Sequence, residues 1–180
     1  MTQPQTQPQN PPLRAPFNLG PMPVDRTLVM VDEAVVRASV EATFNVVRDV
    51  ERWPERLPHY RYVRFRSRNR DGGGVVEMSA NRPFGPLNWP TRWVAQMAVD
   101  DSPPSIRFRH IEGVTTGMDV EWTFEPHADG TRVRLFHVWN GPDWPGLGTA
   151  AAVGLIGPVF VHGIATRTIA GLKTATERGQ

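Results

Sequence analysis

The sequence predicts an α+β fold in which a curved, seven-stranded antiparallel sheet wraps around a long C-terminal helix. Three observations support this class. A Val-rich segment opens the domain, apolar residues alternate with polar ones through six further segments, and the last segment changes to a helical period. Alternation with a period of two indicates an antiparallel sheet with one buried face. A sheet that curves around a helix tends to leave a cavity between the two layers.

The 180 residues suit one domain, which we place at residues 24–180. Residues 1–23 are rich in Gln and Pro and are expected to form a disordered tail without the features of a signal peptide. The longest apolar stretch, residues 150–161, is too short to span a membrane, which takes about 20 residues. The chain has no cysteine, which excludes disulfides and thiolate chemistry and fits a cytoplasmic location.

The first elements are a strand over residues 28–38 and two short helices. Ser39 is a suitable helix N-cap, and Glu41 places a negative charge in the first turn. Trp53-Pro54 interrupts the helical pattern and Leu57-Pro58 ends it, so we expect two short helices here rather than one long one.

Six antiparallel strands and a helix are expected to follow. Apolar residues alternate with polar ones from residue 60 and then over residues 76–80, 91–100, 106–110, 118–125 and 132–139. Asp71-Gly72-Gly73-Gly74 and Asp129-Gly130 read as turns between strands. A helical stripe then predicts a C-terminal helix from about Gly157 to Arg178, with Pro158 tolerated in its first turn.

Aromatic residues on the inward face of the sheet are the candidates for cavity walls, because rings offer a large contact area to planar ligands. Some of them are also expected to be ordinary core. The residues that we expect to line the cavity are Trp93, Phe108, Trp122, His137 and Trp139.

His137 is the strongest candidate for chemistry. Its neighbours at a spacing of two, Leu135 and Trp139, are apolar, so the alternation turns the imidazole inward. It is a candidate general acid or base, or a hydrogen-bond donor to a ligand carbonyl; the alternative is a core histidine. His110 lies inward by the same argument. No third ligand stands at a coordinating spacing, and we predict neither a metal nor a cofactor.

One single arginine and one row of arginines each have two possible interpretations. Arg82 continues the inward phase of residues 76–80 and is a candidate to meet a ligand carboxylate or phenolate, or else it is exposed. An outward row on one strand is suited to phosphates, although such a row is more often a solvated sheet face. The row consists of Arg64, Arg66, Arg68 and Arg70. Its face carries a single aromatic residue, Tyr62, which disfavours nucleic-acid binding.

Several segments resemble the START and Bet v 1-like superfamily, and within it the polyketide cyclase/dehydrase and coenzyme Q-binding group. The resemblance rests on residues 42–54, the sequence Leu57-Pro58-His59-Tyr60, and residues 120–126 and 130–133, and it extends over residues 28–178. It implies a helix-grip fold with a deep apolar cavity under the C-terminal helix.

Aromatase/cyclases of this group are thought to use an arginine, a histidine and an aspartate in the cavity. His137 matches the histidine, the arginine position holds Gln96 or Met97, and the aspartate position falls near Thr168. Of the three chemical groups, the sequence therefore matches the histidine. At the other two positions the resemblance implies that Met97 and Thr168 contact the ligand.

The function expected from the sequence is binding of a hydrophobic small molecule, such as a polyketide, a quinone or a lipid-like compound. Two alternatives remain open. The first is a cyclase, aromatase or dehydratase that uses His137 as acid and base. The second is a regulator that binds the ribosome or another protein through its outward arginines.

Overall fold

The computed structural model describes residues 13–84, 87–141 and 163–179, with no side chains described for residues 82–89. The elements follow one another in the order that the sequence predicts. They are β1 (Leu28–Val36), α1 (Val40–Arg48), η1 (Val50–Arg52), α2 (Trp53–Arg56), β2 (Tyr60–Arg68), β3 (Gly74–Phe84), β4 (Leu87–Asp101), β5 (Pro104–Gly113), β6 (Asp119–His127), β7 (Gly130–Trp139) and α4 (Gly163–Arg178).

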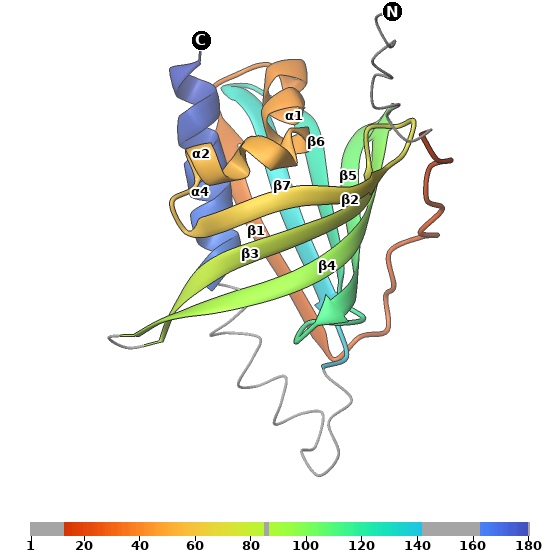
Figure 1. Ribbon diagram of the computed structural model, residues 1–180. Coiled ribbons are helices and arrows are strands. Elements are labelled where there is room, and N and C mark those ends of the chain that lie inside the picture. Colours follow the sequence, from red (N-terminus) through yellow and green to blue (C-terminus); the bar gives the residue numbers. More distant parts are fainter. Residues whose placement is uncertain (1–12, 85–86, 142–162, 180) are drawn as a thin grey trace, which may run out of the picture.

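The seven strands form one antiparallel sheet in the order β1-β7-β6-β5-β4-β3-β2. Figure 1 shows its curvature, with β2 to β4 crossing the front of the molecule and β1, β6 and β7 running behind them. Helix α4 packs against β1 and α1. The predicted α+β helix-grip architecture is confirmed.

The segment after β1 forms three short helical pieces, where the sequence predicted two. Ser39 caps α1 as expected, since its hydroxyl oxygen accepts a hydrogen bond from the Ala42 N–H at 3.1 Å. The chain then makes the single turn η1 and the four-residue helix α2. The indole N–H of Trp53 donates to the Val47 carbonyl at 3.0 Å, which ties α2 back to α1.

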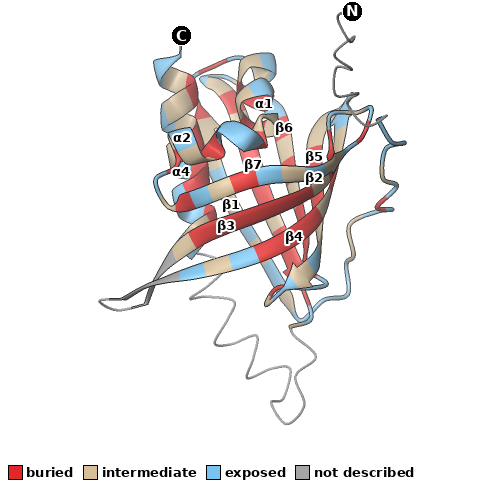
Figure 2. Ribbon diagram, viewed as in Figure 1, coloured by how far each residue is buried: buried red, intermediate tan, exposed pale blue. Residues whose placement is uncertain are grey.

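The core lies on the inward face of the sheet, under α4 and α1. Residues 131, 133, 135 and 137 of β7 are buried and alternate with half-buried neighbours, as the sequence predicts. Strand β3 departs from alternation, and Figure 2 shows a continuous buried stretch along it. Met78 and Ala80, which point inward, are buried, and so are their outward-pointing neighbours Glu77 and Ser79. Arginine side chains from the adjacent strands cover Glu77, as described below.

A bulge in β5 changes the direction of one acidic side chain. Trp93 pairs with Gly113, Val94 with Glu112 and Ala95 with His110, so Ile111 is an extra residue in β5. An extra residue shifts the alternation after it by one position. Glu112, which strict alternation places on the same face as His110, therefore reaches the arginines on the outer face.

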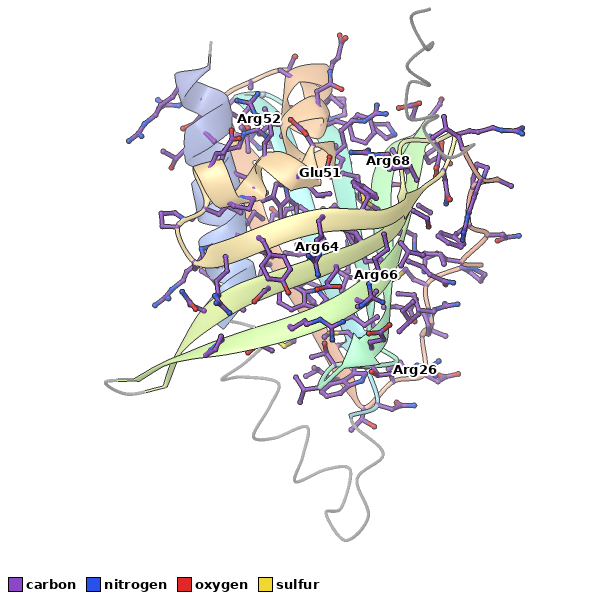
Figure 3. All side chains as sticks on the ribbon, viewed as in Figure 1. Arg26, Glu51, Arg52, Arg64, Arg66 and Arg68 are labelled. Atoms are coloured by element: carbon purple, nitrogen blue, oxygen red, sulfur yellow. The ribbon has the colours of Figure 1, made fainter. Side chains whose placement is uncertain are left out.

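A second irregularity, between Phe65 and Ser67 of β2, breaks the predicted row of four arginines. Arg64 and Arg66 remain together on the outer face, where both bind Glu77. Arg68 instead binds Glu51 of η1 and lies over the ring of Phe65, 4.1 Å from its centroid. Figure 3 shows Arg68 and Glu51 near each other, apart from Arg64 and Arg66. Arg70 lies in the turn before β3.

Residues 13–23 belong to the segment that was expected to be a disordered tail, and the structure records contacts for them. Arg14 forms a parallel bridge with Asn69, and Leu19 is buried. The Arg109 guanidinium donates to the Leu19 carbonyl at 3.0 Å. Disorder in the rest of the segment, residues 1–12, stays a prediction outside the described residues.

The C-terminal helix ends at Arg178, as predicted. Its predicted first turns, from Gly157, lie outside the described residues, and Gly163 is the first helical residue that the structure describes. Within the described part of the chain, no helix is long and apolar enough to cross a membrane.

Candidate functional site

A pocket lies between the inward face of the sheet and α4. Strands β2 to β7 contribute side chains to one wall, α2 contributes Trp53, and α4 closes the other side. The lining residues are Trp53, Tyr60, Met78, Trp93, Phe108, His110, Thr115, Met118, Val120, Trp122, Leu135, His137, Ile164, Ala165 and Thr168.

Most of the site residues expected from the sequence meet in this pocket. The six that line it are Trp93, Phe108, His110, Trp122, His137 and Thr168. The side chain of Arg82 lies outside the described part of the structure.

Two expected residues, Met97 and Trp139, are not among the lining residues. Both are almost fully buried in the core. Trp139 stands at the end of β7, where its indole N–H donates to the Thr116 carbonyl at 2.9 Å. Alternation identifies the face of a strand on which a residue lies, but it does not say where along that face the core ends and the pocket begins.

Sequence reasoning missed several lining residues. Trp53 and Tyr60 come from the Trp-Pro and Leu-Pro-His-Tyr segments, which supported the family resemblance but had not been assigned to the cavity. Met78 and Met118 also reach the pocket. The inward phase of Met78 and Met118 was a usable signal, whereas the approach of α2 to the pocket depends on tertiary packing.

Aromatic rings form a connected set along the pocket. Trp93 stacks on His110 with ring centroids 6.0 Å apart and an interplanar angle of 22°. Tyr60 meets Trp93 edge to face at 6.1 Å. Trp53 contacts Tyr60 at 5.3 Å and Trp122 at 6.0 Å. Such a set offers both ring faces and ring edges to a planar ligand.

The polar groups that the described lining residues bring to the pocket are hydroxyl, indole and imidazole groups. His110 Nδ1 lies 2.7 Å from Thr115 Oγ1, and His137 contributes the second imidazole of the lining. Thr168 Oγ1 lies 3.1 Å from Nε2 of His59, which stands behind the pocket wall. Among the described lining residues there is no Asp, Glu, Lys or Arg. This arrangement suits neutral hydrogen-bonding groups, such as carbonyl and hydroxyl oxygens, on an otherwise apolar ligand. No group of three His, Asp or Glu residues in the described chain could hold a metal ion.

The free volume of the pocket is about 70 Å³. This is room for several water molecules, since one needs at least about 10–15 Å³. Pockets that enclose drug-sized ligands have volumes of about 300–1,000 Å³. A ligand of several rings therefore requires the lining to open, and the unbranched side chains of Met78 and Met118 are the members most able to move.

The outer face of the same strands carries a network of charged groups. The buried carboxylate of Glu77 accepts hydrogen bonds from Arg64, Arg66 and Arg92 at 2.9–3.1 Å, and from the Tyr62 hydroxyl at 2.9 Å. Glu112 pairs with Arg66 at 2.6 Å and with Arg92 at 3.2 Å. Figure 3 shows Arg64 and Arg66 over the front of the sheet.

These bonds, the one from Arg92 most strongly, lower the pKa of Glu77 to about 2 although burial opposes the shift. Glu77 therefore stays ionised near neutral pH and neutralises part of the arginine charge. The outer face offers an anionic partner less charge than the arginine row suggested from sequence.

The curved sheet, the C-terminal helix and the aromatic pocket between them define a helix-grip domain. The family model described as "Polyketide cyclase / dehydrase and lipid transport" matches residues 36–157. The chain belongs to this family.

One curated relative and two solved structures show how the chain compares with other proteins. A protein named "Putative polyketide cyclase", from Streptomyces cyaneus, is 26% identical over 104 residues, which cover 57% of this chain and 66% of the relative, just under two thirds of its length. The Zhui aromatase/cyclase from Streptomyces sp. R1128 has a TM-score of 0.72 at 16% identity, covering 84% of this chain and 94% of that one. A START superfamily protein from Mycobacterium smegmatis has a TM-score of 0.67 at 13% identity, covering 84% and 99%. At these identities the structural likeness establishes the fold alone.

Proposed function

We propose that this protein binds a hydrophobic, ring-containing small molecule, such as a polyketide or a quinone, in the pocket between the sheet and α4. The observation that carries the proposal is the connected set of rings around Trp93, in a lining without a described charged residue. Family membership supports the same class of ligand. The neutral hydroxyl and imidazole groups suit a ligand that bears a few oxygen atoms.

The first experiment is native mass spectrometry of the purified protein, followed by organic extraction of whatever co-purifies. A bound quinone, polyphenol or polyketide would support the proposal and identify the compound. In parallel, 2-methyl-1,4-naphthoquinone can be titrated while the fluorescence of the pocket tryptophans is followed. The absence of cysteine removes the usual nucleophile that would react with this quinone.

A pair of variants on α4 tests where the probe binds. Ala165 is buried and lines the pocket, so Ala165→Phe fills the space that the ligand would occupy. We expect this change to weaken quinone binding at least tenfold, at a cost in stability of about 1–3 kcal/mol from overpacking. Ala170→Phe, on the exposed side of the same helix, is the matched control and should bind normally. Equal affinity of the two variants would place the probe elsewhere and contradict the proposal.

A second candidate function, catalysis of a cyclisation or dehydration, is favoured by the position of His137. Its imidazole lines the pocket beside Leu135. In a cyclisation it would remove a proton from an activated carbon, which attacks a ketone carbon of the same chain, and return that proton to the new alkoxide. Removal of a second proton from the attacking carbon and its transfer to the hydroxyl group then releases water and leaves a carbon–carbon double bond.

The test of catalysis is incubation with a short poly-β-ketone thioester, with mass spectrometry to detect loss of one water molecule per chain. If His137 is the acid and base, His137→Ala should abolish this product and leave affinity for the probe within about threefold. Product formation that is unchanged in His137→Ala would contradict the catalytic role, whereas a protein that binds ligand without any turnover would be a carrier.

A further inference from the structure

His59 does not line the pocket, but it contacts two residues that do. It directly precedes β2, and its carbonyl accepts a hydrogen bond from the Asn81 N–H of β3 at 2.7 Å, which fixes this part of the chain. Its Nε2 lies 3.1 Å from the hydroxyl oxygen of Thr168 on α4. Its ring packs on the ring of Tyr60, with centroids 4.9 Å apart.

The hydroxyl of Thr168 differs from those of Thr174 and Thr176 on the same helix. Thr174 and Thr176 donate to the carbonyls four residues earlier, at 3.0 Å and 2.8 Å. Thr168 is hydrogen-bonded to His59 instead, and it is 2% exposed at the wall of the pocket. A hydroxyl group has one donor and two acceptor positions, so after one bond to the imidazole it can still bond to a ligand.

The protonation state of His59 decides what Thr168 can offer. Burial, and secondarily the nearby Arg167 guanidinium, lower the pKa of His59 to about 4, so the ring is neutral near pH 7. A neutral imidazole either donates from Nε2 or accepts there. When Nε2 donates, the Thr168 proton remains available for a ligand carbonyl. When Nε2 accepts, the Thr168 oxygen remains available for a ligand hydroxyl.

We propose that His59 is a positioning residue that holds the Thr168 hydroxyl at the pocket wall, so that the pair favours ligands carrying an oxygen over purely hydrocarbon ones. This role rests on the proposed ligand binding. Sequence reasoning had considered Thr168 alone, because nothing local connects residues 59 and 168.

The experiment compares two probes of similar shape, 2-methyl-1,4-naphthoquinone and 2-methylnaphthalene, by quenching or enhancement of tryptophan fluorescence. A neutral hydrogen bond contributes about 0.5–1.5 kcal/mol, which corresponds to about 2–12-fold in affinity. We expect His59→Phe and Thr168→Val each to weaken quinone binding by about that factor and to leave 2-methylnaphthalene binding unchanged. The double variant should lose no more than either single one, because the two residues act as one unit.

Two further variants separate positioning from a structural effect. In His59→Gln, a side-chain amide group replaces Nε2 with both donor and acceptor capacity, and we expect quinone affinity to be largely restored. Thr174→Val on the exposed side of α4 should bind both probes as the wild type does. Circular dichroism establishes that each variant is folded.

Three results would count against the proposals, and they are distinguishable. Wild-type protein that binds neither probe overturns the proposed function and this role together. Wild-type binding of both probes with no selective loss of quinone affinity in the folded His59 and Thr168 variants overturns the positioning role alone. A loss for both probes, or additive losses in the double variant, likewise shows that His59 is structural.

Discussion

The two faces of strands β3 to β5 place opposite kinds of chemistry within one layer of backbone. On the inner face, Met78, Trp93 and Phe108 form a pocket wall without charge. On the outer face, the residues directly before Met78 and Trp93 in the chain, Glu77 and Arg92, belong to an ion-pair network. A strand alternates its side chains with a period of two, so neighbours in sequence serve separate roles.

This difference indicates where function and stability are located. The charged groups of the outer network bind one another, and the buried Glu77 is surrounded by donors. The hydroxyl and imidazole groups of the inner face border a space that a ligand can enter. We therefore expect outer-face substitutions to change stability and pH dependence, and inner-face substitutions to change stability and ligand binding together.

The largest effect is expected on the inner face, at Trp122. This residue is 2% exposed, contacts Trp53 and lines the pocket. Trp122→Ala should lower the free energy of unfolding by about 3–5 kcal/mol, measured by urea denaturation. Val29→Ala, at an exposed position on β1, should change it by less than about 0.5 kcal/mol. A cost below about 1 kcal/mol for Trp122→Ala would show that the inner face is loosely packed.

The next effect is expected at Glu77. Glu77→Gln keeps the shape of the side chain but removes the negative charge that three arginines surround. We expect a loss of about 2–3 kcal/mol at pH 7. Glu125→Gln is the matched control, because Glu125 pairs with Arg134 at an exposed site, where such a pair contributes about 0–1 kcal/mol.

A comparison of the wild type with Glu77→Gln also tests how stability depends on pH. The pKa of Glu77 is lowered from 4.5 to about 2 in the folded protein, so its contribution is present above pH 4.5 and is lost as the pH falls toward 2. The difference in stability between wild type and Glu77→Gln should therefore shrink over that window. A difference that persists undiminished at pH 2 would mean that shape rather than charge accounts for the loss.

A smaller effect is expected from His59, at a milder pH. Its pKa is lowered from 6.5 to about 4, so between those values the unfolded chain binds a proton that the folded chain does not. Stability should fall as the pH is lowered from 6.5 toward 4, by about 1–2 kcal/mol after allowance for partial solvent screening. Thermal denaturation at pH 7 and pH 5 should show a weaker decline for His59→Gln. If the wild type and His59→Gln lost the same stability between pH 7 and pH 5, titratable groups other than His59 would be responsible.

The sequence predicted much of the fold because its signals are local. Turn residues at Asp129-Gly130, the N-cap at Ser39 and the period of two through β7 each act over a few residues, and the structure has them where they were expected. The predicted inward direction of His110 and His137 followed from the same alternation and is confirmed by their place in the pocket.

The departures arise where one residue changes the register or where distant segments meet. The extra residue Ile111 turns Glu112 to the outer face, and the irregularity before Ser67 separates Arg68 from Arg64. A single inserted residue leaves almost no trace in a hydrophobic pattern, although it reverses the facing of the residues after it.

The sequence by itself determined the class of fold, the order of the strands and, away from the two bulges, the face on which a strand residue lies, because these follow from backbone periodicity and turn chemistry. The tertiary structure decided where the pocket ends, so that Met97 and Trp139 belong to the core while Trp53 and Tyr60 line the cavity. It also brought His59 to Thr168, 109 residues apart. Such contacts depend on how far the sheet curves and how α4 packs against it. Contacts among many side chains set both of these together, so no single segment of the sequence reveals them.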